Sequence, residues 1–189
     1  MAANTKTHKK VDSKGFTVWF TGLACSGKST IADKLVPILA GKGFKVERLD
    51  GDVVRQSLTR DLGFSVEDRR KNIERVAFVA KLLTRNDVVV LATFISPEIQ
   101  MRENARKEIG NFIEVHVRAS VEACAKRDVK GMYKKAFAGQ IKDFTGVHAS
   151  APYEEPPNPE LMVDTEKLTI DECVSKVLDT LVALGYIEP

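Results

Sequence analysis

Short apolar runs rich in β-branched residues alternate along the chain with longer stretches of helical periodicity. The apolar runs cover residues 17–21, 45–50, 87–94, 112–118 and 161–163, and the helical stretches cover 28–41, 52–59, 66–85, 98–109, 120–128 and 170–184. Strands buried on both faces have such continuous apolar runs, and helices between consecutive strands are typical of parallel crossovers. The pattern predicts an α/β fold of three layers, with a parallel five-stranded sheet flanked by helices.

A glycine-rich loop follows the first apolar run. Residues 22–29 read Gly-Leu-Ala-Cys-Ser-Gly-Lys-Ser and fit G-x-x-x-x-G-K-[ST], the pattern of loops that wrap nucleotide phosphates. Because a helix is predicted from Lys28, backbone N–H groups would converge on a phosphate at its N-terminus. Lys28 would reach the β and γ oxygens, and Ser29 would ligate Mg²⁺. The competing interpretation is a glycine-rich turn with a surface lysine.

Two carboxylates come at the end of the second run, where the sequence is Asp50-Gly51-Asp52. Ligands of open α/β sheets bind at this carboxyl edge. The third run ends without a carboxylate, so supporting a metal ion and deprotonating an acceptor hydroxyl both fall to Asp50 and Asp52. The alternative is that D-G-D only forms a turn, since aspartate and glycine are common turn residues.

Polar residues share the apolar face of the third helical stretch. Arg69 and Asn72 lie on the same side as its apolar stripe, and Arg55 can face the same cleft from the preceding helix. The stripe consists of Val66, Ile73, Val76, Ala77, Ala80 and Leu83. An anionic ligand would supply the partner that such polar groups need, although an arginine there can also extend to the rim. Ser65 and Asp68 fit a capping pattern, which gives Asp68 a structural role.

Composition agrees with one globular domain over residues 15–189, preceded by an arm at 1–14 that we expect to be mobile. Apolar residues make up 43% of the chain and charged residues 29%, and the N-terminus shows no secretory pattern. No apolar run approaches the roughly 20 residues that span a bilayer, so we expect a cytoplasmic protein with no membrane partner. The cysteines, at positions 25, 124 and 173, have unrelated spacings and indicate neither a disulfide framework nor a zinc site.

Charge is unevenly distributed along the chain. The net charge of +3 is too small to argue for nucleic acid, yet residues 126–142 hold six basic side chains and the single acid Asp128. This segment either faces a polyanion or is a solvated face. Residues 131–159 fit neither period well and end in several prolines, which predicts a basic, partly helical lid at about 129–150.

Together these motifs resemble the adenylylsulfate kinase (adenosine 5′-phosphosulfate kinase) family of P-loop kinases. The resemblance rests on residues 19–23, 49–55, 61–65, 68–73, 94–97, 127–135, 144–146 and 153–156, together with the phosphate loop. It implies a P-loop kinase fold and ATP-dependent phosphorylation of the ribose 3′-hydroxyl of adenylyl sulfate (APS). The products would be ADP and 3′-phosphoadenylyl sulfate (PAPS), as in sulfate assimilation. The family also implies Mg²⁺, a homodimer and, with no sulfurylase segment in this sequence, a stand-alone kinase.

The resemblance also assigns roles to residues of this sequence. Lys28, Asp52 and Asp50 would be catalytic, and Ser29 and Asp50, the latter through water, would support the metal. The ATP site would consist of Gly22, Cys25, Ser26, Gly27, Lys28, Ser29, Thr30 and Arg127. The APS site would consist of Asp52, Arg55, Phe64, Arg69, Asn72, Ile95, Ser96, Lys130, Gly131, Phe144 and Thr145. Phe64 and Phe144 would sandwich the APS adenine.

Three places depart from the family pattern. Val53 replaces the usual asparagine of D-G-D-N, Phe137 stands where the lid normally has arginine, and residues 148–152 look slightly lengthened. Two other functions compete with APS phosphorylation. One is a P-loop kinase for a nucleoside monophosphate or a sugar acid, which the set Phe64, Arg69, Asn72 and Phe144 disfavours. The other is a nucleotide-dependent binding protein without turnover, which would lack an acceptor-site carboxylate such as Asp52.

Overall fold

A parallel five-stranded sheet forms the centre of the molecule, a computed structural model that describes residues 14–189. The strands are β1 (Thr17–Thr21), β2 (Lys45–Asp50), β3 (Val88–Thr93), β4 (Phe112–Arg118) and β5 (Leu161–Asp164). Their order is β2-β3-β1-β4-β5, and every neighbouring pair is parallel. The predicted arm lies outside the described residues except for Lys14, whose backbone N–H donates to Asp87 Oδ1 at 2.9 Å.

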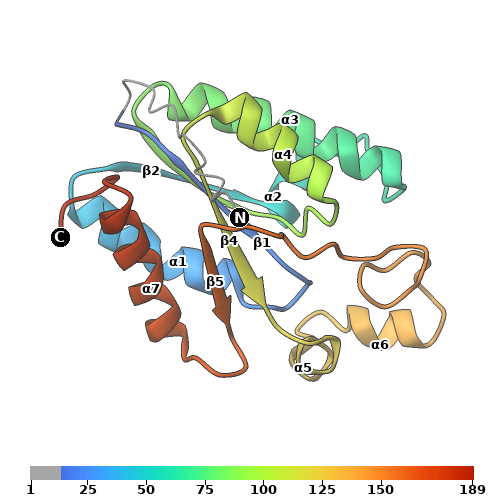
Figure 1. Ribbon diagram of the computed structural model, residues 1–189. Coiled ribbons are helices and arrows are strands. Elements are labelled where there is room, and N and C mark those ends of the chain that lie inside the picture. Colours follow the sequence, from blue (N-terminus) through green and yellow to red (C-terminus); the bar gives the residue numbers. More distant parts are fainter. Residues whose placement is uncertain (1–13) are drawn as a thin grey trace, which may run out of the picture.

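Helices cover both faces of the sheet, as Figure 1 shows. The helices are α1 (Lys28–Gly41), α2 (Gly51–Gln56), α3 (Val66–Thr84), α4 (Ile99–Ile109), α5 (Val121–Arg127), α6 (Met132–Phe137) and α7 (Ile170–Ala183). One face carries α1 and α7, the other carries α3 and α4, and α5 and α6 lie beyond the carboxyl ends of the strands. The predicted three-layer fold is therefore confirmed. Within residues 14–189, no helix combines the length and apolar character needed to cross a membrane.

The central strand β1 is buried on both faces, which gives the loop after it a rigid base. Phe20 packs in the core beneath α1 and α7, whereas Trp19 packs in the core beneath α3 and α4. The Trp19 indole stacks on the Phe94 and Phe112 rings, with centroids 5.5 and 5.7 Å apart. Alternating side chains on a fully buried strand thus connect the two cores.

The structure corrects several sequence expectations. Helix α2 ends at Gln56 rather than 59, because the Ser57 and Thr59 N–H groups both turn back to the Val54 carbonyl. Val66 belongs to the apolar stripe predicted for this helix but is 47% exposed. Val66 lies in the first turn of α3. In this turn Arg69 contacts Thr145 of the lid rather than the core. The predicted start of α3 is confirmed, because Ser65 Oγ accepts from the Asp68 N–H.

Candidate active site

The glycine loop between β1 and α1 has the backbone shape that its sequence predicts. Gly22 has φ 148°, and a Cβ there would lie 2.3 Å from the Val117 carbonyl oxygen. Gly27 has φ 105° and precedes the first residue of α1, whose opening N–H groups have no partner within the helix. The Ser26 hydroxyl is buried without a hydrogen-bond partner. A cradle at a helix N-terminus with an unsatisfied buried hydroxyl fits an anion such as a phosphate.

The Lys28 side chain folds back over this loop. Its ammonium donates to the carbonyls of Gly22 at 2.9 Å and Leu23 at 2.6 Å, and the residue is only 8% exposed. Burial lowers the Lys28 pKa to about 8, although the nearby charges of Asp50 and Asp52 oppose the shift. The ammonium therefore lies inside the loop. A bound phosphate would replace the two carbonyl oxygens as its hydrogen-bond acceptor. Ser29 and Thr30 follow in the exposed first turn of α1.

Asp50 is the centre of a hydrogen-bond cluster at the end of β2. Its Oδ2 accepts from Ser29 Oγ, Thr93 Oγ1 and an Arg48 guanidinium nitrogen, each at 2.8 Å. Burial would raise the Asp50 pKa, but these hydrogen bonds, the one from the Asp52 N–H and the Arg48 charge together lower it. The carboxylate is thus charged and nearly saturated with donors, which leaves it little capacity for direct metal ligation.

Sequence reasoning missed Arg48 and Thr93. A signal for Arg48 was present, since it precedes Asp50 by two positions in a strand and so shares its face. Arg48 also pairs with Asp33 at 2.6 Å. Thr93 had no local signal, because its contact with Asp50 depends on the parallel register that pairs these two residues across β2 and β3.

Asp52 lies in the first turn of α2, where its side chain is 68% exposed. The Lys130 ammonium, from the loop between α5 and α6, forms an ion pair with Asp52 Oδ2. Asp52 also acts electrostatically on both Lys28 and Arg55. It is therefore a solvent-accessible carboxylate between the phosphate loop and the arginines of α2 and α3.

Two guanidinium groups, those of Arg55 and Arg69, act electrostatically on each other near Asp52. Arg55 stacks over the Phe64 ring at 4.4 Å and donates to the Gly63 carbonyl at 2.9 Å. Arg69 donates to the Phe64 carbonyl, to Thr145 Oγ1 and to the Asp143 carbonyl. Burial lowers the pKa of both arginines, and the Arg69 charge lowers that of Arg55 further. Two partly buried cations at close range favour an anionic ligand between them.

Polar groups of three further expected acceptor-site residues, Asn72, Ile95 and Ser96, also have protein partners. Asn72 Oδ1 accepts from the Thr59 hydroxyl at 2.8 Å, and the Ile95 carbonyl accepts from Thr21 Oγ1 at 2.8 Å. Ser96 is 2% exposed, and its hydroxyl accepts from Trp19 Nε1 at 3.0 Å. Ser96 also has φ 39°, a left-handed backbone that is unusual for serine.

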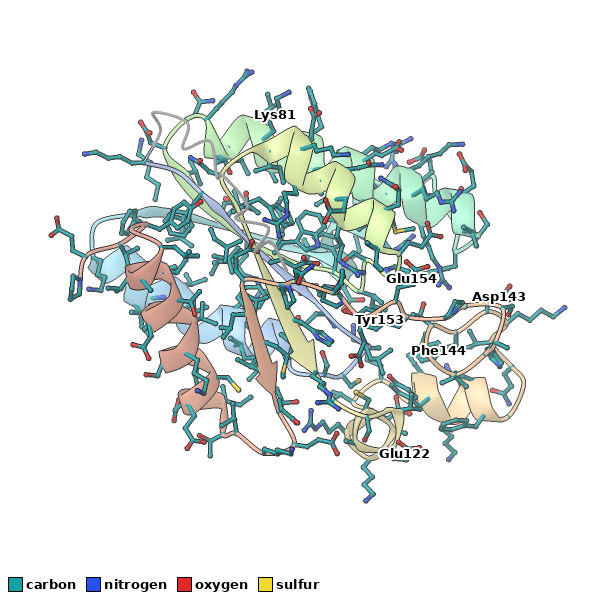
Figure 2. The ribbon with its side chains drawn as sticks, in the orientation of Figure 1. Lys81, Glu122, Asp143, Phe144, Tyr153 and Glu154 are labelled. Atoms are coloured by element: carbon teal, nitrogen blue, oxygen red, sulfur yellow. The ribbon has the colours of Figure 1, made fainter. Side chains whose placement is uncertain are left out.

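The two aromatic residues expected around an adenine, Phe64 and Phe144, lie on different segments of the chain. Phe64 is 65% exposed after α2, whereas Phe144 belongs to the lid and packs edge-on against Tyr133, with centroids 4.9 Å apart. Figure 2 labels Phe144 and Asp143 in the lid loop that extends away from the sheet. Among residues 14–189 the structure records no ring contact between Phe64 and Phe144.

The lid rests directly on the phosphate loop. Helix α6 starts after Gly131 within the lid, and Tyr133 donates its hydroxyl proton to the Ala24 carbonyl at 3.0 Å. A Cβ on Gly146 would lie 2.5 Å from Leu23 Cδ2, so lid and loop are in close contact there. Arg127 approaches the loop from α5 and donates to Thr165 Oγ1 at 2.9 Å and to the Thr165 carbonyl at 2.7 Å. It also reaches the Cys25 and Ser26 carbonyls at 3.4 Å.

The glycine loop with its lysine, the serine bound to Asp50 and the basic segment that rests on the loop are features of a P-loop kinase. The comparisons with known proteins identify the family. The adenylylsulphate kinase family model matches residues 14–164, and the chain belongs to this family. The resemblance drawn from the motifs is confirmed, and so is the prediction of a kinase.

Sequence relatives support this identification over nearly the whole chain. An adenylyl-sulfate kinase from Halothermothrix orenii is 56% identical over 93% of this chain and 94% of its own length. One from Picosynechococcus is 50% identical over 95% of this chain and 100% of its own length. A probable adenylyl-sulfate kinase from Pseudomonas aeruginosa is 57% identical over 89% of this chain and 78% of its own length.

Solved structures agree with both the fold and the family. The APS kinase of Mycobacterium tuberculosis, solved in complex with AMPPNP and APS, superposes with a TM-score of 0.85 and 42% identity. The match covers 89% of this chain and 98% of that one. A gluconokinase from Sinorhizobium meliloti, at 16% identity and a TM-score of 0.59 over 90% of this chain and 93% of its own, shares the fold alone.

Proposed function

We propose that this kinase transfers the γ-phosphoryl group of ATP to the ribose 3′-hydroxyl of APS, giving PAPS and ADP. The position of Asp52 carries the proposal. This exposed carboxylate acts electrostatically on Lys28 of the phosphate loop and on Arg55 of the acceptor side. A hydroxyl bound beside Asp52 therefore lies between a phosphoryl donor and an anion pocket. The family relatives and the solved APS complex of the related kinase support APS as the acceptor.

The donor half stabilises negative charge. Lys28 leaves the Gly22 and Leu23 carbonyls for the β and γ oxygens of ATP, and the N–H groups at the start of α1 hold the β-phosphate. Arg127 lies against the loop carbonyls and is placed to contact the nucleotide. Cys25, Ser26, Gly27 and Thr30 contribute backbone and hydroxyl groups to the same cradle.

The residues near the loop fit a magnesium ion, which prefers oxygen ligands and retains several waters. Ser29 Oγ would bind it directly. Asp50 would bind it through water, because its own oxygens already accept from Ser29, Thr93, Arg48 and the Asp52 N–H. When bound, the ion neutralises charge on the transferred phosphoryl group. Within residues 14–189 no cluster of three or more His, Cys, Asp or Glu could hold a metal without the nucleotide.

The acceptor half orients APS. Asp52 accepts a hydrogen bond from the 3′-hydroxyl and takes its proton as the phosphoryl group transfers. Arg55 and Arg69 bind the phosphosulfate group, with Asn72 nearby on α3. Phe64 and Phe144 hold the adenine, and Ile95, Ser96, Gly131 and Thr145 line the site. Lys130 brings the lid to Asp52.

A coupled assay for ADP release tests the proposal. We expect rapid release with APS and little with AMP or gluconate, which represent the two competing kinase functions. Release with APS no faster than the buffer blank would contradict the proposal. Binding of ATP without turnover of any acceptor would instead support the nucleotide-dependent binding protein.

We further propose that the chain forms a homodimer and acts in the cytoplasm, both of which rest on the family resemblance. Light scattering coupled to size-exclusion chromatography measures the mass directly. A mass of about 21 kDa, the monomer value, would reject the dimer.

A further inference from the structure

The segment that leads from the lid back to the sheet is fixed to the start of α4. The Glu154 N–H donates to the Pro97 carbonyl at 2.9 Å, and Glu154 Oε2 accepts from the Ile99 N–H at 2.6 Å. The α4 N-cap residue, Glu98, makes no side-chain cap hydrogen bond, so the Glu154 carboxylate caps this helix from another segment. Figure 2 shows Tyr153 and Glu154 on this returning segment, next to the start of α4.

One buried side chain joins this returning segment to the loop after β3. Arg102 of α4 is 2% exposed, and its guanidinium donates to the Ser96 carbonyl at 2.6 Å and to the Glu154 carbonyl at 2.7 Å. Its Nε lies 2.8 Å from Glu114 Oε1, which supplies the opposite charge. The same guanidinium lies over the Tyr153 ring, 5.7 Å from the centroid.

The Ser96 backbone needs such support. A serine at φ 39° persists only where its surroundings fix it, because left-handed backbone is costly for residues with a Cβ. Arg102 holds the Ser96 carbonyl, while Trp19 donates to its hydroxyl. The planar fork of arginine binds two carbonyls in fixed relative positions, and lysine cannot reproduce that geometry.

We propose that Arg102 is a positioning residue for the acceptor half of the active site. It fixes the loop at 95–97 relative to the returning segment at 153–155, and so determines how tightly APS binds while leaving the ATP half unchanged. The inference rests on the proposed function, in which Ile95, Ser96 and the lid belong to the APS site. No Arg102 contact recorded in the described part of the chain reaches the phosphate loop.

Arg106 provides a matched control one turn further along α4. It pairs with the same Glu114 at 3.4 Å and with Glu160 at 2.7 Å, and it donates to the Phe112 carbonyl at 3.2 Å. It therefore belongs to the same ion network but holds neither of the two segments that Arg102 joins. Replacing Arg106 therefore disturbs the ion network while the Arg102 hydrogen bonds to Ser96 and Glu154 remain.

The experiment compares Arg102→Lys with Arg106→Lys in steady-state kinetics and thermal unfolding. Both variants retain a positive charge near Glu114, so we expect similar, modest falls in Tm. For Arg102→Lys we expect the KM for APS to rise about tenfold or more, as for loss of a charge-assisted hydrogen bond. The KM for ATP should stay within about twofold. Arg106→Lys should leave both KM values near the wild-type values.

Three kinetic outcomes would overturn the inference: an unchanged APS KM in Arg102→Lys, equal rises for APS and ATP, or an equal APS effect in Arg106→Lys. Hydrogen exchange supplies a readout that does not depend on APS turnover. The amides of Ile99 and Glu154 should exchange faster in Arg102→Lys than in Arg106→Lys, and equal rates would contradict the proposed bridge. A wild-type protein inactive on APS would refute the proposed function, while hydrogen exchange would still test the bridge.

Discussion

Lys130 of the lid forms an ion pair with Asp52 at the start of α2. The contact joins a basic segment to the carboxylate that we assign to the acceptor hydroxyl. Both side chains are more than half exposed, so the pair contributes little to folding. Its significance is positional, because it places a lid cation next to the reacting group.

Replacing Lys130 by alanine should weaken APS binding without loss of fold. Exposed ion pairs contribute about 1 kcal/mol or less, so the Tm should change by no more than a few degrees. We expect the KM for APS to rise more than the KM for ATP. Lys134→Ala serves as the control, since Lys134 is an exposed lid lysine of α6 with no recorded ion pair to Asp52. Equal effects of the two substitutions would remove the specific role of Lys130.

Asp52→Asn should lower kcat by about 10²- to 10⁴-fold, the range for loss of a general base. The KM for ATP should change little, because Asp52 makes no recorded contact with the phosphate loop other than through its charge. Initial rates at saturating APS measure the effect. An unchanged kcat would dismiss Asp52 as the acceptor base.

The buried ammonium of Lys28 should make ATP binding depend on pH. Burial lowers its pKa to about 8 from 10.5, so above pH 8 the free protein loses the positive charge that meets the phosphates. We expect kcat/KM for ATP to fall above pH 8, and ATP binding there to take up a proton because the bound polyanion raises the pKa again. Calorimetry in buffers of different ionisation enthalpy measures that proton.

The lowered pKa of Lys28 also makes the stability of the fold depend on pH. Between pH 8 and 10.5 the unfolded chain keeps the Lys28 proton that the folded protein has lost, so this group makes the free energy of unfolding rise with pH.

For the pH dependence of kcat/KM, Lys28→Arg is the control, because arginine stays protonated. A break in the kcat/KM profile near pH 8 that persists in Lys28→Arg would assign it to another group.

Arg69→Ala should weaken APS binding selectively, since Arg69 joins the Phe64 carbonyl to lid residues Thr145 and Asp143. We expect the APS KM to rise at least about tenfold, the lower range for hydrogen bonds to a charged group. Arg70→Ala is the matched control, because the neighbouring Arg70 pairs with Glu98 instead. An equal loss of ATP binding would show that the helix had been damaged.

Asp50→Asn should raise the Mg²⁺ concentration needed for half-maximal activity by about tenfold, in the range seen when outer-shell partners of a metal are removed. The substitution removes the charge next to Ser29 while keeping the shape. Asp33→Asn is the control, since Asp33 also pairs with Arg48 but is 67% exposed. Titration of Mg²⁺ at fixed ATP makes the measurement, and an unshifted midpoint would exclude Asp50 from metal support.

The central strands β1 and β4 were predicted accurately because burial on both faces produces continuous apolar runs. The bounds of Thr17–Thr21 and Phe112–Arg118 agree with the structure. The phosphate loop followed from its glycines and its place between a strand and a helix. Local periodicity could identify these elements because residues close in the sequence determine their conformation.

The lid and the links between segments could not be predicted in the same way. Helix α6 is capped by Asp128, which accepts the N–H groups of Tyr133 and Lys134, and it packs on the phosphate loop rather than on the sheet. Arg102 reads in the sequence as a polar position on an amphipathic helix. Its role depends on hydrogen bonds to the Ser96 and Glu154 carbonyls, which are far apart in the sequence and come close to Arg102 only in the folded protein.

Because the lid contacts the phosphate loop, we expect the two proposed half-sites to be thermodynamically linked. Leu23 lies against Gly146, and the Ala24 carbonyl accepts from Tyr133, so a nucleotide that rearranges the loop changes the free energy of each lid conformation. Linkage is reciprocal, so an acceptor that changes the lid conformation would alter the affinity for the donor by the same factor by which the donor alters the affinity for the acceptor. We therefore expect binding of the donor and binding of the acceptor to be coupled through the contact between lid and loop.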